Sequence, residues 1–367
     1  MIYLDNGATS FHKPPAVAAA MAWAVKNCAN PGRGGYDGAM LAAKMVYGCR
    51  ETAGELFGCR PEQVVFTQNC THGLNIAIRT LVKPGSWVVI SGFEHNAVTR
   101  PLHGLGAKRI VAGRRLFDRE NTLYEFEKAL RAGADAAVFT HVSNVFGYIL
   151  PVKEMAALCR QYGVPFIVDA AQSAGTLPVN LDALGADFIA MPGHKGLLGP
   201  QGTGLLLCAK LPEVLLAGGT GSESVMQDMP DYLPDRAEAG TLNVPGIAGL
   251  GAALKFLQKA DMRKIAAREH SAAMRCGLLL TEMGLRVFTG EDQAATVSFV
   301  PECDCEELAQ RLAQKGIAVR AGLHCAPLAH ESAGTLDSGT VRVSFGPDAA
   351  VSQAEILAKK IRECAVF

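Results

Sequence analysis

The sequence predicts an α/β fold in which a mostly parallel sheet is covered by helices on both faces. Short apolar strands without polar alternation, such as 136–140 and 187–191, are typical of strands buried on both sides. These strands alternate with helical stretches over most of the first 210 residues. The length of 367 residues and the 49% hydrophobic content suffice for a large core and for a second, smaller domain.

The first part of the chain supplies the elements of this sheet. Residues 1–6 read as a short strand, and two prolines open a helix at 14–28. A glycine-rich loop at 30–36 leads to a helix at 37–57, which ends at Gly58. The alternation then predicts strands at 64–67, 85–90, 109–112, 136–140, 165–168, 187–191 and 204–208, with helices at 74–82, 123–131 and 152–162.

A different pattern begins after an irregular stretch at 209–246 and a helix at 247–260. It mixes short strands with helices and predicts a smaller α+β domain. We expect a large domain at 15–250 and a small domain at 251–367, with segment 1–14 packing near the small one. The expected elements are helices at 262–284, 304–315 and 351–364 and strands at 286–288, 296–299, 317–320 and 340–344.

Polar side chains gather in the loops that follow the predicted strands. In open parallel sheets, ligands bind beyond the carboxyl ends of the strands. We therefore expect one site built by five loop residues: Thr71, His95, Asn144, Asp169 and Lys195.

Lys195 lies in a glycine-rich loop, where a lysine commonly has one of three roles. It can bind phosphate, form a Schiff base with a carbonyl, or be a solvated loop lysine, and for a lone lysine the last is the commonest. A phosphate loop of the G-x-x-x-x-G-K-[S/T] type does not fit, because Gly196 follows Lys195. The Schiff-base role needs partner residues elsewhere in the chain.

Composition excludes several classes of function. The 35 basic and 35 acidic residues balance, which argues against nucleic acid and anionic membranes as partners. No apolar run is long enough for a transmembrane helix, and the N-terminus does not resemble a signal peptide.

The cysteines indicate a reducing compartment. They number 11, and they form neither a disulfide framework nor a C-x-x-C pair. We therefore expect a cytoplasmic protein. The near pair Cys303 and Cys305 flanks Asp304, which is better explained as a helix cap completed by Glu307 than as part of a metal site.

A family resemblance rests on motifs that occur in one order along nearly the whole chain. They are Tyr3-Leu-Asp-Asn6, Asn30-Pro31, Arg33-Gly34, Phe66-Thr67 through Thr71, Glu94-His95, Ser143-Asn-Val145, Asp169-Ala-Ala-Gln-Ser173, Gly193-His-Lys195, Glu238-Ala-Gly-Thr241 and Arg320-Ala-Gly-Leu-His-Cys-Ala326. The chain resembles the class V aminotransferases among the fold-type I pyridoxal-phosphate enzymes. This resemblance implies a seven-stranded sheet, a homodimer and pyridoxal 5'-phosphate as cofactor.

The resemblance also assigns roles around the cofactor. Lys195 would hold it covalently and act as the base, and Asp169 would pair with the pyridine nitrogen. His95 would stack on the ring, while Gln172 and Asn144 would hydrogen-bond its phenolic oxygen. The phosphate would be bound by Thr71, the backbone N–H of His72, His194, and Thr241 of the other subunit.

Cys325 distinguishes between reactions, because a transaminase needs no cysteine there. The run Arg320–Ala326 resembles the R-x-G-x-x-C-A motif of group II cysteine desulfurases. This resemblance implies that L-cysteine becomes L-alanine and leaves a persulfide on Cys325, for delivery to a sulfur-acceptor protein. Arg342 would bind the substrate carboxylate, assisted by Asn144 and Arg320. His324 would lower the pKa of Cys325.

Several of these residues, taken singly, also suit purely structural positions. Asp169 and Thr71 suit helix caps, and Cys325 suits a buried structural position. His95 and His194 suit solvated loops. The alternative functions are a selenocysteine lyase, a transaminase or β-lyase acting on another small amino acid, and a non-enzymatic scaffold. The chain departs from the family at Pro192, His72 and Asn96, where relatives usually carry Ser or Thr, Glu, and His.

Overall fold

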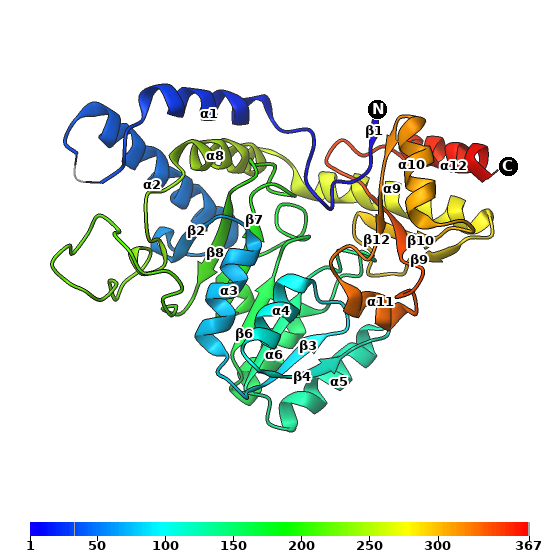
Figure 1. The fold of residues 1–367 in the computed structure, drawn as a ribbon, viewed down its shortest axis with the longest axis horizontal. Helices are drawn as coiled ribbons and strands as arrows, with labels where there is room; N and C mark the ends of the chain where they lie inside the picture. The colour runs from blue at the N-terminus through cyan, green and yellow to red at the C-terminus, as the bar shows by residue number, and fades with distance from the viewer. Residues whose placement is uncertain (33, 366–367) are drawn as a thin grey trace.

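The computed structural model describes residues 1–32 and 34–365 and contains the expected α/β sheet (Figure 1). Seven strands lie in the order β2-β8-β7-β6-β5-β3-β4, and only β8 runs antiparallel to its neighbours. The α/β prediction and the seven-stranded sheet are therefore confirmed. The strands are β2 (Val64–Thr67), β3 (Trp87–Ser91), β4 (Lys108–Ala112), β5 (Ala136–Thr140), β6 (Phe166–Asp169), β7 (Phe188–Pro192) and β8 (Gly204–Cys208).

Helices cover both faces of this sheet. Neighbouring residues such as Ile167 and Val168 are buried in different apolar clusters, one on each face. One face packs on α3 (Cys70–Leu81) and α4 (Asn96–Gly104). The other packs on α2 (Asp37–Phe57), α5 (Arg119–Arg131), α6 (Val152–Tyr162) and α8 (Val244–Lys259); α1 (Pro15–Asn27) lies against α8, and α7 (Leu181–Leu184) precedes β7.

A second sheet and its own apolar cluster form the C-terminal part of the molecule. The antiparallel order is β12-β13-β10-β9, and α9 and α12 pack beside it. These elements are α9 (Met262–Glu282), β9 (Arg286–Phe288), β10 (Thr296–Val300), α10 (Cys305–Gln314), β12 (Arg320–Gly322), α11 (Pro327–Ala333), β13 (Thr340–Ser344) and α12 (Val351–Ala365).

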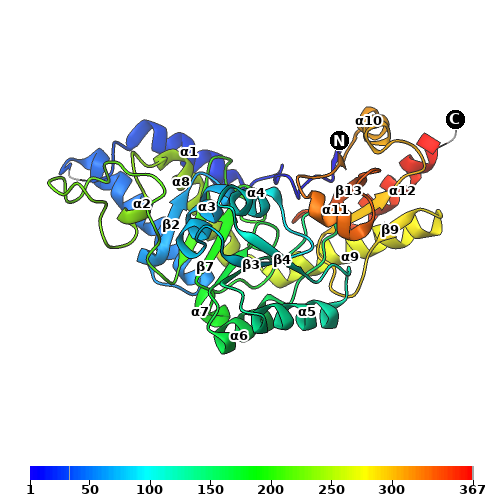
Figure 2. The ribbon, with the colours of Figure 1, turned by 60° about the horizontal axis from the view of Figure 1, so that its bottom comes forward.

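The N-terminal segment crosses from one sheet to the other. Strand β1 (Ile2–Tyr3) pairs with β11 (Ile317–Ala318) beside the C-terminal sheet, whereas α1 lies over the large one (Figure 1). The view in Figure 2 shows the same separation between the two parts. The expected domain limits stay a prediction, and residue 250 lies inside α8.

Several element boundaries differ from those expected. Helix α3 begins four residues early, and α4, α7 and α11 were not expected. The strand expected at 317–320 is two strands, β11 and β12, in different sheets. Short 3-10 turns occur at Pro61–Gln63 and Asp235–Ala237. No helix in the described part of the chain is long and apolar enough to cross a membrane.

Candidate active site

A cavity at the carboxyl ends of β5, β6 and β7 brings the predicted loop residues together. Its walls contain seven of the predicted site residues: Thr71, His95, Asn144, Asp169, Gln172, His194 and Lys195. They come from loops that lie far apart in the sequence. The prediction of one shared site for these loops therefore agrees with the fold, while their chemical roles stay a prediction.

Lys195 is held in the loop that joins the antiparallel strands β7 and β8. The loop is closed by hydrogen bonds from Gly193 N to Thr203 O at 2.8 Å and from Gly199 N to Gly193 O at 2.7 Å. Burial lowers the pKa of Lys195 from its usual value, and the positive charge of Arg342 lowers it further. This shift favours the neutral amine, which is the form that reacts with a carbonyl.

Asp169 ends β6 with its carboxylate at the cavity. Its Oδ1 accepts the Ala171 N–H at 2.9 Å and the Cys70 thiol at 3.4 Å. No hydrogen bond to Oδ2 occurs among the residues that the structure describes. The free oxygen of this carboxylate can therefore accept a hydrogen bond from a cationic donor of a ligand in the cavity.

His95 has a defined orientation at the start of α4. Its Nδ1 accepts the Ala97 N–H at 3.0 Å, which assigns the ring proton to Nε2. Burial lowers its pKa. A neutral imidazole presents an uncharged face to the cavity.

The N-terminus of α3 lies at another wall of the cavity. Asn69 caps this helix, because its Oδ1 accepts the His72 N–H at 2.9 Å. The His72 N–H, which was expected to bind the phosphate, donates within the helix cap in this structure, and its phosphate contact stays a prediction. Thr71 lies in the cavity wall, and the His72 ring instead accepts the Gln68 N–H at 3.3 Å.

Two amide side chains tie the cavity to other parts of the chain. Gln172 Nε2 donates to Gly7 O at 2.9 Å, and Asn144 Nδ2 donates to His324 O at 2.8 Å.

His194 Nδ1 lies 3.1 Å from Thr9 Oγ1, and burial lowers the pKa of His194 to about 4. Pro192 occupies the last position of β7, in the same wall.

Cys325 lies in a loop that reaches the cavity from the second sheet. Its carbonyl accepts the Asn96 N–H at 2.8 Å. The loop is therefore hydrogen-bonded to the residue that follows His95. The Cys325 side chain is exposed. His324 and Cys325 have φ values of 50° and 56°, a left-handed conformation that costs a residue with a side chain about 1–2 kcal/mol.

His324 does not supply a positive charge to Cys325. Its ring is buried and its Nε2 lies 3.2 Å from Thr340 O. Burial, with a further effect of Arg342, lowers the pKa of His324 to about 2, so the ring is neutral.

Arg342 and Arg320 meet at a carboxylate of this chain. Arg342 is buried on β13 and donates from Nη2 to Asp5 Oδ1 at 2.7 Å and from Nη1 to Asn144 O at 3.1 Å. Arg320 Nε lies 3.1 Å from Asp5 Oδ2. Asp5 had no predicted role, although an acidic residue directly after the buried Leu4 is a signal for an ion pair.

Thr241 does not line the Lys195 cavity. It lies in the wall of another cavity, which also contains Asn30, Tyr47 and Thr220. Arg33 of the family motif lies outside the described residues. Asn69 and Cys70 are cavity residues that were not predicted from the sequence, and their position just before Thr71 in the same loop was the available signal. Asp304 caps α10 as predicted, and the described residues contain no group of metal ligands.

Comparisons with known proteins place the chain among enzymes of one family. The Aminotransferase class-V family model matches residues 2–357. The chain is 32% identical to a probable cysteine desulfurase of Methanothermobacter thermautotrophicus, over 99% of this chain and 94% of that protein. It is 34% identical to a cysteine desulfurase of Synechococcus elongatus, over 89% of this chain and 55% of that protein.

Solved structures agree with these sequence relatives. The apo cysteine desulfurase of Thermococcus onnurineus NA1 superimposes with a TM-score of 0.90 at 32% identity, covering 99% of this chain and 94% of that one. A cysteine desulfurase of Escherichia coli gives a TM-score of 0.85 at 27% identity, covering 98% and 94%.

Proposed function

The chain belongs to the aminotransferase class-V family, and on that premise we propose that it is a cysteine desulfurase that depends on pyridoxal 5'-phosphate. The observation that carries the proposal is the attachment of the Cys325 loop to the Lys195 cavity through Asn96 and Asn144. A transaminase has no use for an exposed thiol at that position. The reaction makes the protein a sulfurtransferase.

Members of this family use pyridoxal 5'-phosphate, and the residues of this chain fit that cofactor. Asp169 has a free carboxylate oxygen for a protonated ring nitrogen, and burial lowers the pKa of the Lys195 amine. Thr71 and His194 would hold the phosphate, His95 would lie on the ring, and Gln172 and Asn144 would reach its phenolic oxygen. When bound, the cofactor withdraws electrons from the α-carbon of the substrate.

The remaining steps belong to side chains of the protein. Arg342 would bind the substrate carboxylate, with Asn144 and Arg320 beside it. In its unprotonated form, Nζ of Lys195 would take the proton from the substrate α-carbon. The Cys325 thiolate would then attack the substrate sulfur: an S–S bond forms, the Cβ–S bond breaks, and its electron pair stays with the carbon fragment. That fragment takes up one proton at Cβ, regains a proton at Cα from Lys195 and leaves as alanine, and Cys325 keeps a persulfide.

Product analysis tests this function. The protein loaded with pyridoxal phosphate is incubated with L-cysteine, and alanine and persulfide are measured. We expect equal amounts of both in a single turnover, and neither in Cys325→Ala, which should keep its visible cofactor band. Full alanine formation by Cys325→Ala would contradict the role of Cys325.

Selenocysteine lyase activity is the nearest alternative, because the same cavity and thiol loop suit a selenium atom. The discriminating measurement is kcat/KM for L-cysteine and L-selenocysteine side by side. A transaminase or a β-lyase would instead yield a keto acid or pyruvate. The left-handed Cys325 loop argues against both, since neither reaction uses its thiol.

A homodimer is the proposed assembly. Exposed apolar side chains lie around the loop 209–243 and the start of α2, including Val225, which is 94% exposed, and Met226, Tyr36 and Met40. Thr241 lies in this region, apart from the Lys195 cavity of its own chain. Contact between two copies through this surface would give Thr241 access to the partner's phosphate site.

The proposed partners and compartment follow from the same chemistry. The exposure of Cys325 allows a sulfur-acceptor protein to reach the persulfide. All 11 cysteines are free thiols, which supports a reducing and therefore cytoplasmic compartment.

A further inference from the structure

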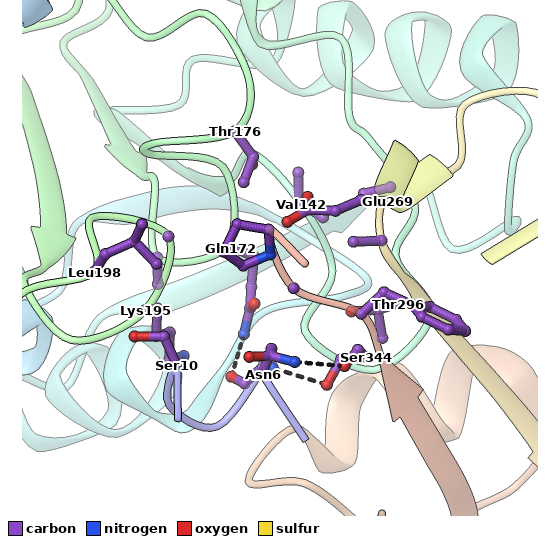
Figure 3. Close-up of a pocket in the computed structure, with 18 residues that line it drawn as sticks. Asn6, Ser10, Val142, Gln172, Thr176, Lys195, Leu198, Glu269, Thr296 and Ser344 are labelled. Atoms are coloured by element: carbon purple, nitrogen blue, oxygen red, sulfur yellow. Dashed lines mark hydrogen bonds between the residues drawn. The ribbon is translucent and has the colours of Figure 1, made fainter. Parts of the chain in front are cut away.

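The segment 4–10 connects the two arginines with the Lys195 loop. Ser344 N donates to Leu4 O at 2.7 Å, which joins the segment to the end of β13. On its other side, Ser10 N donates to His194 O at 2.9 Å and Gln172 donates to Gly7 O. Figure 3 shows Asn6 between Ser344 and Gln172 in this arrangement. The backbone on both sides of Asp5 is therefore fixed.

Asp5 is the anion of a three-charge cluster. Its carboxylate is 2.7 Å from Arg342 and 3.1 Å from Arg320, and its side chain is 13% exposed. Arg342 is almost fully buried, whereas the side chain of Arg320 is half exposed. Two guanidinium groups and one carboxylate leave a single positive charge uncompensated.

The cluster also has a hydrogen-bond donor that is free to bind an anion. Arg342 uses Nη2 for Asp5 and Nη1 for Asn144 O, while its buried Nε has no partner in the described part of the chain. A buried donor without a partner costs free energy until a ligand satisfies it. One carboxylate of a ligand can accept a hydrogen bond from Arg342 Nε and neutralise the remaining positive charge of the cluster.

We propose that Asp5 is a specificity-determining counter-ion of the substrate site. It fixes the guanidinium of Arg342 and limits the cluster to the α-carboxylate of an amino acid whose side chain is uncharged. An amino acid with a second acidic group meets the negative charge of Asp5 in a weakly solvated site, where like charges repel strongly. The inference rests on the proposed role of Arg342 in binding the substrate carboxylate.

Ligand binding to the cofactor-loaded protein tests this role without turnover. The ligands are L-alanine and L-cysteate, which differ by a sulfonate on the β-carbon, and the dissociation constants come from the change in cofactor absorbance. In Asp5→Asn, we expect the preference for cysteate over alanine to rise at least tenfold, and 0.5 M NaCl to reduce this gain. The charge-conserving Asp5→Glu should keep the preference of the unchanged protein within about threefold.

Arg320→Gln provides a second test that leaves Asp5 in place. Removing one positive charge makes the cluster neutral, so the preference for cysteate should fall at least threefold. This variant also covers the case in which Asp5→Asn does not take up the cofactor.

An unchanged preference in both Asp5→Asn and Arg320→Gln would overturn the proposal, even if both ligands bind more weakly, because that outcome describes a purely structural ion pair. Failure of the proposed function itself would give another result: neither amino acid would change the cofactor spectrum of the unchanged protein.

Discussion

Two buried glutamates show different ways of placing a carboxyl group inside this protein. Glu238 is paired: Arg50 donates to it from both ends of its guanidinium fork, and Phe66 N adds a third hydrogen bond. Glu269 on α9 lines a cavity and has no ion pair among the described residues (Figure 3). Glu238 is stabilised by its ion pair with Arg50. Glu269 has a raised pKa because it is buried, which favours its protonated form.

Removing the partner of Glu238 should be costly. In Arg50→Met, the buried carboxylate loses its counter-ion, and we expect the free energy of unfolding to fall by about 3–5 kcal/mol. Urea denaturation measures this change. Lys44→Met, at an exposed position of the same helix, is the matched control and should change stability by less than about 0.5 kcal/mol. A similar small loss in both variants would show that the ion pair contributes nothing.

Glu269 should make stability depend on pH. Burial raises its pKa to about 8, with Arg268 opposing and Asp348 adding to the shift. The folded protein then holds a proton that the unfolded chain releases near its ordinary value of 4.5. Stability should therefore fall between about pH 4.5 and pH 8 and fall no further above that range.

Glu269→Gln should remove this part of the pH dependence. The variant should gain stability relative to the unchanged protein as pH rises from 5 to 8, by at most about 1.4 kcal/mol per pH unit. Thermal unfolding at several pH values measures the difference. Glu282→Gln, exposed on the same helix, should run parallel to the unchanged protein. A pH-independent difference for Glu269→Gln would contradict the raised pKa.

Among the elements, α3 combines a structural cap with the expected phosphate site. Asn69 caps the helix and also lines the Lys195 cavity. In Asn69→Asp, the carboxylate can still cap, and its charge suits the helix dipole. The same charge would repel a phosphate at that helix end.

Asn69→Asp should therefore separate stability from cofactor affinity. We expect unfolding of the cofactor-free protein to change by less than about 1 kcal/mol, and the dissociation constant for pyridoxal phosphate to rise at least tenfold. Absorbance titration measures the second quantity. Asn180→Asp, the same change at the cap of α7, should leave the affinity unchanged. Equal cofactor affinities in the two variants would argue against a phosphate at α3.

Sequence periodicity predicted the long elements well and the short ones poorly. The inner strands β5, β7 and β8 of the large sheet are apolar and buried on both faces, so their signal is strong, whereas the edge strand β4 begins with the exposed pair Lys108-Arg109. Helix α4 was not predicted because Pro101 lies inside its nine residues and a proline normally ends a helix. Helix α11 has only seven residues, and seven are too few to show a period.

The site residues were predictable to a different degree. Asp169 and Lys195 follow buried strands, and that position alone suggests a ligand site. The pairing of Asp5 with Arg342 spans 337 residues and depends on the meeting of β13 and the N-terminal segment. The left-handed backbone of Cys325 was also hidden, because neither residue of the pair His324-Cys325 is a glycine.

At the scale of the whole molecule, the exposed loop 209–243 should decide assembly. Val225 is 94% exposed, and a charge at this position would be buried unpaired in the proposed dimer. We expect Val225→Glu to raise the dimer dissociation constant at least tenfold, as measured by sedimentation equilibrium. Tyr124→Glu, at an exposed position on α5, should leave it unchanged. A monomeric unchanged protein would contradict the proposed dimer and the role of Thr241.

The distribution of thiols has a practical consequence for labelling. Only Cys303 and Cys325 are exposed among the 11 cysteines, and burial raises the pKa of Cys49, Cys159 and Cys276 to about 12. Thiolates are the species that react with alkylating dyes. A Cys303→Ser background therefore leaves Cys325 as the one exposed thiol, beside the half-buried Cys28 and Cys59, and a fluorescent label on it would report on the arrival of an acceptor at the Cys325 loop.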